Sequence, residues 1–247
     1  MRWRICVFAA MVVALACAGR VRGQRAQGND NAAASNALIA QLQTAIQNRQ
    51  WQPAADLAKQ LIELNPDRWT YRQSLGSAQL NLGQYDDALK TLDAGIKLAQ
   101  AELNAKAPES DPIKLKAGIV MMFTSEGNAY LKLKKNDLAI AAYTKAAELD
   151  PNPGTAYFNI CAVQYNTGNT EGAMAACDKA IAADPKKADA YFIKGSLLIA
   201  ASTTDANGKV IAPPGTVEAL KKYLELAPDG QHARDVKDML EYVGVKQ

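Results

Sequence analysis

A spacing of 34 residues recurs through the middle of this chain and relates residues 126–151 to residues 160–185. Residues 75–99 show the same order of small and large side chains. The pairs that stand one period apart are Gly127 and Cys161, Ala139 and Ala173, Tyr143 and Cys177, Ala146 and Ala180, and Pro151 and Pro185. Such a period predicts a repeat protein, in which each unit buries its apolar face against its neighbours.

The residues within each period resemble the tetratricopeptide-repeat (TPR) family, whose period they share. That family has large residues at repeat positions 4 and 24, small ones at 8, 20 and 27, an aromatic near 11 and Pro at 32. The second repeat supplies Phe123, Gly127, Tyr130, Ala139, Tyr143, Ala146 and Pro151. The third supplies Tyr157, Cys161, Ala173, Cys177, Ala180 and Pro185, but has Gln164 at position 11. The first has Gly76, Ala88, Leu92 and Gly95 without the final Pro.

The resemblance implies an all-α fold, a right-handed superhelical solenoid of antiparallel helix pairs with about four to five repeats and a C-terminal capping helix. We expect the solenoid over 36–244, with repeats near 36–68, 69–102, 120–153, 154–187 and 188–231 and the capping helix at 232–243. Gly83 and Gly168 mark turns between helices. Asn207-Gly208 and Pro213-Pro214 predict a hairpin-like insertion at 202–215, and a second insertion is expected at 100–111.

The first 23 residues have the pattern of a secretory signal peptide. Arg2 and Arg4 precede an apolar run of 14 residues, which is shorter than the roughly 20 needed to span a bilayer. Cleavage after Gly23 is preferred, and cleavage after Ala18 or a lipid anchor at Cys17 are the alternatives. Residues 24–35 are small and polar and predict a flexible leader. We therefore expect an exported, periplasmic protein of the bacterial cell envelope.

The charge balance changes when this segment is removed. Loss of four arginines, Arg2, Arg4, Arg20 and Arg22, lowers the formal net charge from +3 to −1. A nearly neutral chain offers no electrostatic attraction for nucleic acid. The expected partner is a protein or peptide, with membrane association only through the alternative lipid anchor.

Two cysteines, Cys161 and Cys177, remain after cleavage at the preferred site. They occupy repeat positions 8 and 24, which lie level with each other in an antiparallel helix pair. Helix packing distances then place their Cα atoms about 4–5 Å apart, near the range of a disulfide. A disulfide is expected in an oxidising compartment, and two buried thiols are the alternative.

The sequence predicts neither an enzyme nor a metal or cofactor site. His232 is the only histidine, and it falls at the start of the capping helix. A Ser-His-Asp or Cys-His site would need this residue, for which a solvated position is expected. The chain contains no glycine-rich phosphate loop.

The predicted binding surface is the concave groove, which first-helix positions 2, 5, 6, 9 and 12 line in this family. The residues expected to contact a partner are Asn128, Leu131, Phe158, Asn159, Tyr165, Phe192 and Ser196, and Ser77, Leu80 and Ser125 share the groove positions. The alternative is that the aromatic residues pack against neighbouring helices as part of the core. The lysine that some family members use to bind a terminal carboxylate is absent, since Thr124 and Asp189 stand where cations would be needed.

Three functions are compatible with these residues. The first is a non-catalytic scaffold of the cell envelope that binds a peptide or protein in the groove. The second is an accessory subunit of an envelope enzyme, assembly or transport complex that acts through the 202–215 loop. The third is self-assembly. Residues 219–230 also resemble repeats of bacterial envelope-assembly proteins, which agrees with export.

Overall fold

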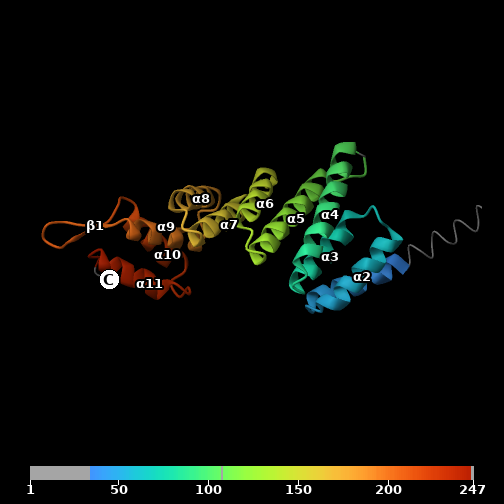
Figure 1. The fold of residues 1–247 in the computed structure, drawn as a ribbon, viewed down its shortest axis with the longest axis horizontal. Helices are drawn as coiled ribbons and strands as arrows, with labels where there is room; N and C mark the ends of the chain where they lie inside the picture. The colour runs from blue at the N-terminus through green and yellow to red at the C-terminus, as the bar shows by residue number, and fades with distance from the viewer. Residues whose placement is uncertain (1–33, 107, 246–247) are drawn as a thin grey trace, which may run out of the picture.

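The computed structural model describes residues 34–106 and 108–245, and the expected signal peptide and nearly all of the leader lie outside this part of the chain. The described residues form helices joined by short turns, with one small hairpin (Figure 1). The helices are 34–47, α2 (Trp51–Leu64), α3 (Trp69–Asn81), α4 (Tyr85–Ala105), α5 (Pro112–Lys132), α6 (Asn136–Leu149), α7 (Gly154–Asn166), α8 (Thr170–Ala183), α9 (Ala188–Ala200), α10 (Thr216–Leu226) and α11 (Ala233–Tyr242).

Consecutive helices pack in pairs, and the pairs follow one another along the long axis of the molecule (Figure 1). The pairs are α3 with α4, α5 with α6, α7 with α8, and α9 with α10. Contacts between pairs continue the stack, because α4 also packs on α5, α6 on α7 and α8 on α9. The predicted all-α solenoid of antiparallel helix pairs is thereby confirmed.

Small residues at repeat position 8 allow the two helices of a pair to approach closely. A Cβ atom added at Gly127 would lie 2.4 Å from Cε1 of Tyr143, so the tyrosine ring fills the space that a side chain would need. The same relation joins Gly76 to Leu92 and Gly195 to Leu220. These large residues are fully buried, and close contact of this kind gives the stack its core.

Replacing Gly127 with alanine is expected to lower the free energy of unfolding by about 1–2 kcal/mol. The added methyl group displaces the Tyr143 ring, and overpacking costs about 1–3 kcal/mol, more than the roughly 1 kcal/mol that alanine gains over glycine in a helix. Urea unfolding measures the difference, with Ser125→Ala on the same helix as the control. Equal or greater stability of Gly127→Ala would show that the ring has room to move.

The turn inside the first, second and third repeats has a left-handed residue at position 15. Gly83 and Gly168 occupy it in the first and third repeats, each with φ of 76°, as the sequence predicted. In the second repeat Lys134 holds the same place with φ of 57°. A residue with a Cβ atom is strained there, because the left-handed region brings Cβ close to the following carbonyl oxygen.

Lys134→Gly is therefore expected to raise the free energy of unfolding by about 0.5–1 kcal/mol. Removal of the Cβ atom relieves left-handed strain of about 1–2 kcal/mol, and the greater freedom of glycine in the unfolded chain offsets part of the gain. Thermal unfolding of the variant should show a higher midpoint. Lys116→Gly, at an exposed position inside helix α5, is the matched control and should lower the midpoint.

Residues 100–105 of the insertion expected at 100–111 are helical, which the repeat pattern did not predict. Helix α4 continues to Ala105 and α5 already begins at Pro112. Asp111 caps α5, since its Oδ1 accepts hydrogen bonds from the backbone N–H groups of Ile113 at 2.9 Å and Lys114 at 3.2 Å. Both helices thus have 21 residues, against 13 or 14 in α6, α7, α8 and α9.

A two-stranded antiparallel hairpin joins α9 to α10. Strand β1 (Thr203–Thr204) pairs with β2 (Val210–Ile211), and the hairpin extends beyond the helices at the C-terminal end (Figure 1). The carboxylate of Asp205 accepts hydrogen bonds from the backbone N–H groups of Asn207 and Lys209, and Gly208 has φ of 79°. Helix α11 then packs on α10 and α9 through Val236 and Leu240, both of which are buried.

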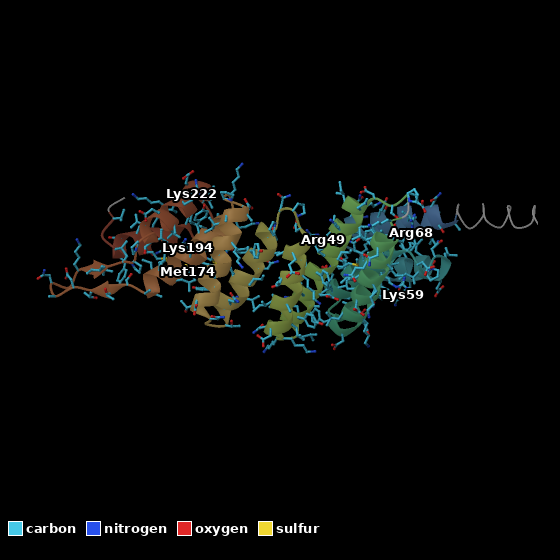
Figure 2. All side chains as sticks on the ribbon, turned by 90° about the horizontal axis from the view of Figure 1, so that it is seen from above. Arg49, Lys59, Arg68, Met174, Lys194 and Lys222 are labelled. Atoms are coloured by element: carbon cyan, nitrogen blue, oxygen red, sulfur yellow. A yellow bond between two sulfur atoms is a disulfide. The ribbon has the colours of Figure 1, made fainter. Side chains whose placement is uncertain are left out.

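An ion pair also connects the third and fourth repeats. Lys194 on α9, which is labelled in Figure 2, donates from Nζ to Oδ1 of Asp178 on α8 at 2.5 Å. Both side chains are partly exposed, so the pair contributes modestly to stability.

Candidate functional site

The predicted groove positions of the first two repeats line one cavity of about 500 Å³ between α3 and α5. Its walls are Ser77, Leu80, Asn81, Tyr85, Ser125, Asn128, Leu131 and Lys132. The lining thus combines hydroxyl, carboxamide and ammonium groups with two leucine side chains. A pocket of this kind can receive an extended chain, whose backbone needs hydrogen-bond partners and whose side chains need apolar contacts.

Asn128 is the most clearly placed of the predicted contact residues. Its side chain is exposed on α5, and its Oδ1 accepts a hydrogen bond of 2.7 Å from the hydroxyl of Tyr143 on α6. Leu131, one turn further along α5, is half-buried beside it. The structure therefore brings these two residues together in the same cavity.

The predicted residues of the third repeat lie on α7. Phe158 is half-buried and packs against the core cluster that contains Ile160 and Cys161, while Tyr165 at the end of the helix is 37% exposed. Asn159 is half-buried. The ammonium of Lys187 lies 6.0 Å from the centre of the Phe158 ring, at the limit of a cation–π contact.

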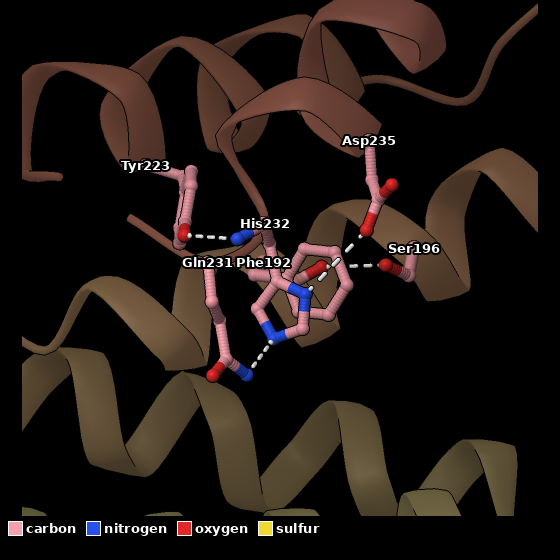
Figure 3. Close-up of polar contacts among 6 residues, drawn as sticks. All are labelled: Phe192, Ser196, Tyr223, Gln231, His232 and Asp235. Carbon is pink, nitrogen blue, oxygen red and sulfur yellow. Dashed lines mark hydrogen bonds and ion pairs between the residues drawn. The ribbon is translucent and has the colours of Figure 1, made fainter. Parts of the chain in front are cut away.

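The predicted residues of the fourth repeat are covered by the C-terminal part of the chain. The ring of Phe192 on α9 stacks on the imidazole of His232, with centroids 3.8 Å apart and ring planes within 3° of parallel (Figure 3). The Ser196 hydroxyl is buried and donates to the backbone carbonyl of Phe192 at 2.8 Å (Figure 3). Phe192 therefore packs against a neighbouring segment of the chain, which is the alternative that the sequence left open.

Both ring nitrogens of His232 have neighbours. Nε2 lies 2.7 Å from the side-chain nitrogen of Gln231, and Nδ1 lies 3.6 Å from Oδ2 of Asp235 (Figure 3). The backbone N–H of His232 donates to the hydroxyl of Tyr223 at 3.0 Å. The imidazole packs on Phe192 and keeps 26% of its side chain exposed, so it is partly solvated.

Cys161 and Cys177 are both buried, and their Cα atoms lie 5.1 Å apart. This separation falls within the range of protein disulfides, and the sulfur atoms lie at bonding distance. The pair joins α7 to α8 within the third repeat, as the repeat positions predicted.

A second cavity, of about 520 Å³, lies on another face, between α4, α5 and α6. Its charged side chains are Asp93, Lys97, Glu126, Lys145 and Glu148. The pKa of Glu126 is raised from 4.5 to about 7, mainly by burial and also by the negative charge of Asp93, while Lys145 opposes the shift. Glu126 is half-buried because three helices pack around it, an arrangement that the repeat pattern alone does not specify.

Two further features bear on the kind of site. Within the described residues, no group of three or more His, Cys, Asp or Glu side chains is arranged to hold a metal ion. The same part of the chain contains no helix that is both long and apolar enough to cross a membrane.

These observations define the class of protein: an all-helical repeat solenoid whose first helices share a cavity-bearing face. The model of the family described as "Tetratricopeptide repeat" matches residues 39–105 and 124–188, which is more than half of the chain. The chain belongs to the tetratricopeptide-repeat family.

Solved structures with the same fold are similar in shape and distant in sequence. MamA 41-end from Desulfovibrio magneticus RS-1 has a TM-score of 0.59 at 18% identity, with 80% of this chain and 97% of that chain covered. YrrB, described as a TPR protein with an unusual peptide-binding site, has a TM-score of 0.56 at 18% identity, with 81% and 90% covered. No curated protein gives a significant match. At such identities the likeness shows the fold alone.

Proposed function

We propose that this protein is a non-catalytic scaffold that binds an extended peptide segment of another protein along the face formed by α3, α5 and α7. The observation that carries the proposal is the cavity between α3 and α5, in which five predicted groove residues meet. TPR proteins bind peptide or protein partners, and the structurally similar YrrB has a peptide-binding site. The scaffold needs no cofactor and contacts no nucleic acid.

We also propose that the protein works outside the cytoplasm, in the cell envelope. Support comes from the signal-peptide pattern of residues 1–23 and from the two cysteines, which are paired as an oxidising compartment favours. The mass of the protein purified from the envelope tests this: a chain that begins at Gln24 is expected. A protein found in the cytoplasm with Met1 intact would contradict export.

Site-specific photocrosslinking in the native cell tests the binding face. A photoreactive residue at Ser125, in the cavity wall, should capture a defined partner. The same residue at Lys90, whose side chain is 79% exposed on α4, should capture little. Equal capture at both positions would show that the groove face is not the binding surface.

The second candidate function is an accessory subunit that acts through the hairpin at 202–215. The observation that favours it is the projection of the hairpin beyond the helices, with Ile211 53% exposed at the end of β2 that lies farther from the turn. Replacement of residues 203–211 by a short glycine turn discriminates the two functions. The groove scaffold keeps its crosslinked partner after this change, and the accessory subunit loses it.

A further inference from the structure

In the second repeat, a hydrogen bond links the second helix, α6, to a residue of α5 that lines the groove. Tyr143 on α6 is 1% exposed, yet its hydroxyl reaches the exposed carboxamide of Asn128 on α5, at 2.7 Å from Oδ1. A fully buried residue therefore forms a hydrogen bond with a side chain that lines the cavity.

Gly127 makes this contact possible. Because glycine has no side chain, the Tyr143 ring crosses the face of α5 at the place where a Cβ atom would lie, 2.4 Å from Cε1. The hydroxyl then emerges beside the next residue, Asn128. The ring is held on both sides by core packing, so its hydroxyl has a fixed position.

The chemistry of the hydroxyl sets the orientation of the carboxamide. Burial raises the pKa of Tyr143 to about 12, so the hydroxyl keeps its proton at neutral pH. Among the residues that the structure describes, Oδ1 of Asn128 is the acceptor for that proton. A buried O–H group needs an acceptor, so Asn128 must present its oxygen to Tyr143 and its NH₂ group to the cavity.

The other repeats show that the fold does not require this pair. The residues at the same two positions are Ser77 and Leu92, Ala162 and Cys177, and Ser196 and Leu220. In these repeats the residue on the second helix is apolar, whether large or small. None of those pairs joins the second helix of the repeat to the groove through a hydroxyl. The pair is therefore an addition to the second repeat, at the residue that lines the cavity.

We propose that Tyr143 is a positioning residue that holds the NH₂ group of Asn128 toward the cavity, where it donates to a main-chain carbonyl oxygen of the bound segment. The proposal rests on the peptide-binding function proposed above and names the group that is recognised. The groove residues around Asn128 are Ser77, Leu80, Ser125 and Leu131, all of them uncharged, and the one charged residue of the cavity lining, Lys132, is exposed to solvent. A neutral, extended segment satisfies such surroundings better than a charged one, since a buried charge needs an opposite charge.

The binding test uses displayed heptapeptides with blocked ends and no charged residues, selected on the full-length wild-type protein. We expect Tyr143→Phe to weaken the selected peptide about 5- to 10-fold, because the carboxamide loses its fixed orientation. Asn128→Ala should weaken it at least as much, and the double variant no more than Asn128→Ala. Asn128→Asp still accepts from Tyr143 but cannot donate, so it should lose binding while remaining folded.

Tyr130→Phe is the matched control, since Tyr130 lies on the same repeat and lines the other cavity. It should bind the selected peptide as the wild type does. The positioning role would be overturned if Tyr143→Phe bound the peptide like the wild type while Asn128→Ala did not. The groove function would then still stand.

Nuclear magnetic resonance separates the two proposals. A slowly exchanging hydroxyl proton of Tyr143, close to Asn128, should be visible in the free protein. Tyr143→Phe should shift and mobilise the Asn128 NH₂ signals, and Tyr130→Phe should not. If no neutral peptide is selected, the groove function at this cavity is wrong, whereas unchanged Asn128 signals in Tyr143→Phe refute the positioning role.

Discussion

Reduction of the Cys161–Cys177 pair should lower the free energy of unfolding by about 3 kcal/mol. The two cysteines are 16 residues apart in sequence, and their bond closes a loop that contains the turn between α7 and α8. In the chain-entropy model a closed loop of about 15 residues restricts the unfolded chain by this amount. The third repeat lies inside the stack, so its destabilisation would also weaken the packing of the repeats on both sides.

The measurement is guanidinium unfolding of the wild type with and without a phosphine reductant. The oxidised protein should unfold at the higher midpoint. Cys161→Ala/Cys177→Ala is the matched control, and its midpoint should not respond to the reductant. A wild-type midpoint that is equal under both conditions would favour the alternative of two buried thiols.

The positions of the helix pairs could be predicted because the signal is local and repeated. Small side chains at fixed intervals are needed wherever two helices touch, so Gly127 and Ala139 identify their helices without knowledge of the partner. Gly83 and Gly168 showed the turns for the same reason: the backbone there must adopt φ above zero. Lys134 shows the limit of that signal, because the structure tolerates a strained lysine at the same place.

The extended helices α4 and α5 were missed because they lie outside the period. Residues 100–105 contain no helix breaker, and Asp111-Pro112 is a good helix start, so the signal was present in the sequence. The 34-residue repeat pattern does not include these residues, so it makes no prediction about their structure. Helix propensity alone would have extended α4 beyond the end of the repeat.

Contacts between distant residues account for the rest. Phe192 and His232 are separated by 40 positions, and their stacking depends on how α11 returns to α9. The contact between Tyr143 and Asn128 was hidden for another reason. The family pattern specifies only a large residue at repeat position 24, so it does not indicate what the hydroxyl at the tip of Tyr143 contacts.

Glu126 gives the second large effect, a loss of stability as pH rises through the range from 4.5 to 7. Its carboxyl lies between α4, α5 and α6 and its pKa is raised to about 7, mainly by burial and then by Asp93. In that range the folded protein keeps a proton that the unfolded chain releases. The free energy of unfolding therefore falls as pH rises, and the loss is complete above about pH 7.

Glu126→Gln removes this titration while keeping the shape of the side chain. The pKa shift corresponds to about 3 kcal/mol at most, and partial exposure to solvent reduces the expected gain to about 1–2 kcal/mol at pH 8. At pH 4 the two proteins should have nearly equal stability, because the carboxyl is largely protonated in both states. Subtraction of the variant's curve from that of the wild type removes the contributions of the other titrating groups.

Urea unfolding from pH 4 to pH 8 measures the difference, with Glu148→Gln as the control, since Glu148 lines the same cavity. The control should retain the wild-type dependence on pH. Parallel curves for wild type and Glu126→Gln would mean that water reaches Glu126 freely and that the carboxyl titrates as an exposed one. A difference that grows between pH 4.5 and 7 would show that ionisation of Glu126 lowers the free energy of unfolding. That loss would arise in the interface between α4, α5 and α6, where Asp93 and Lys145 also act on the Glu126 carboxyl.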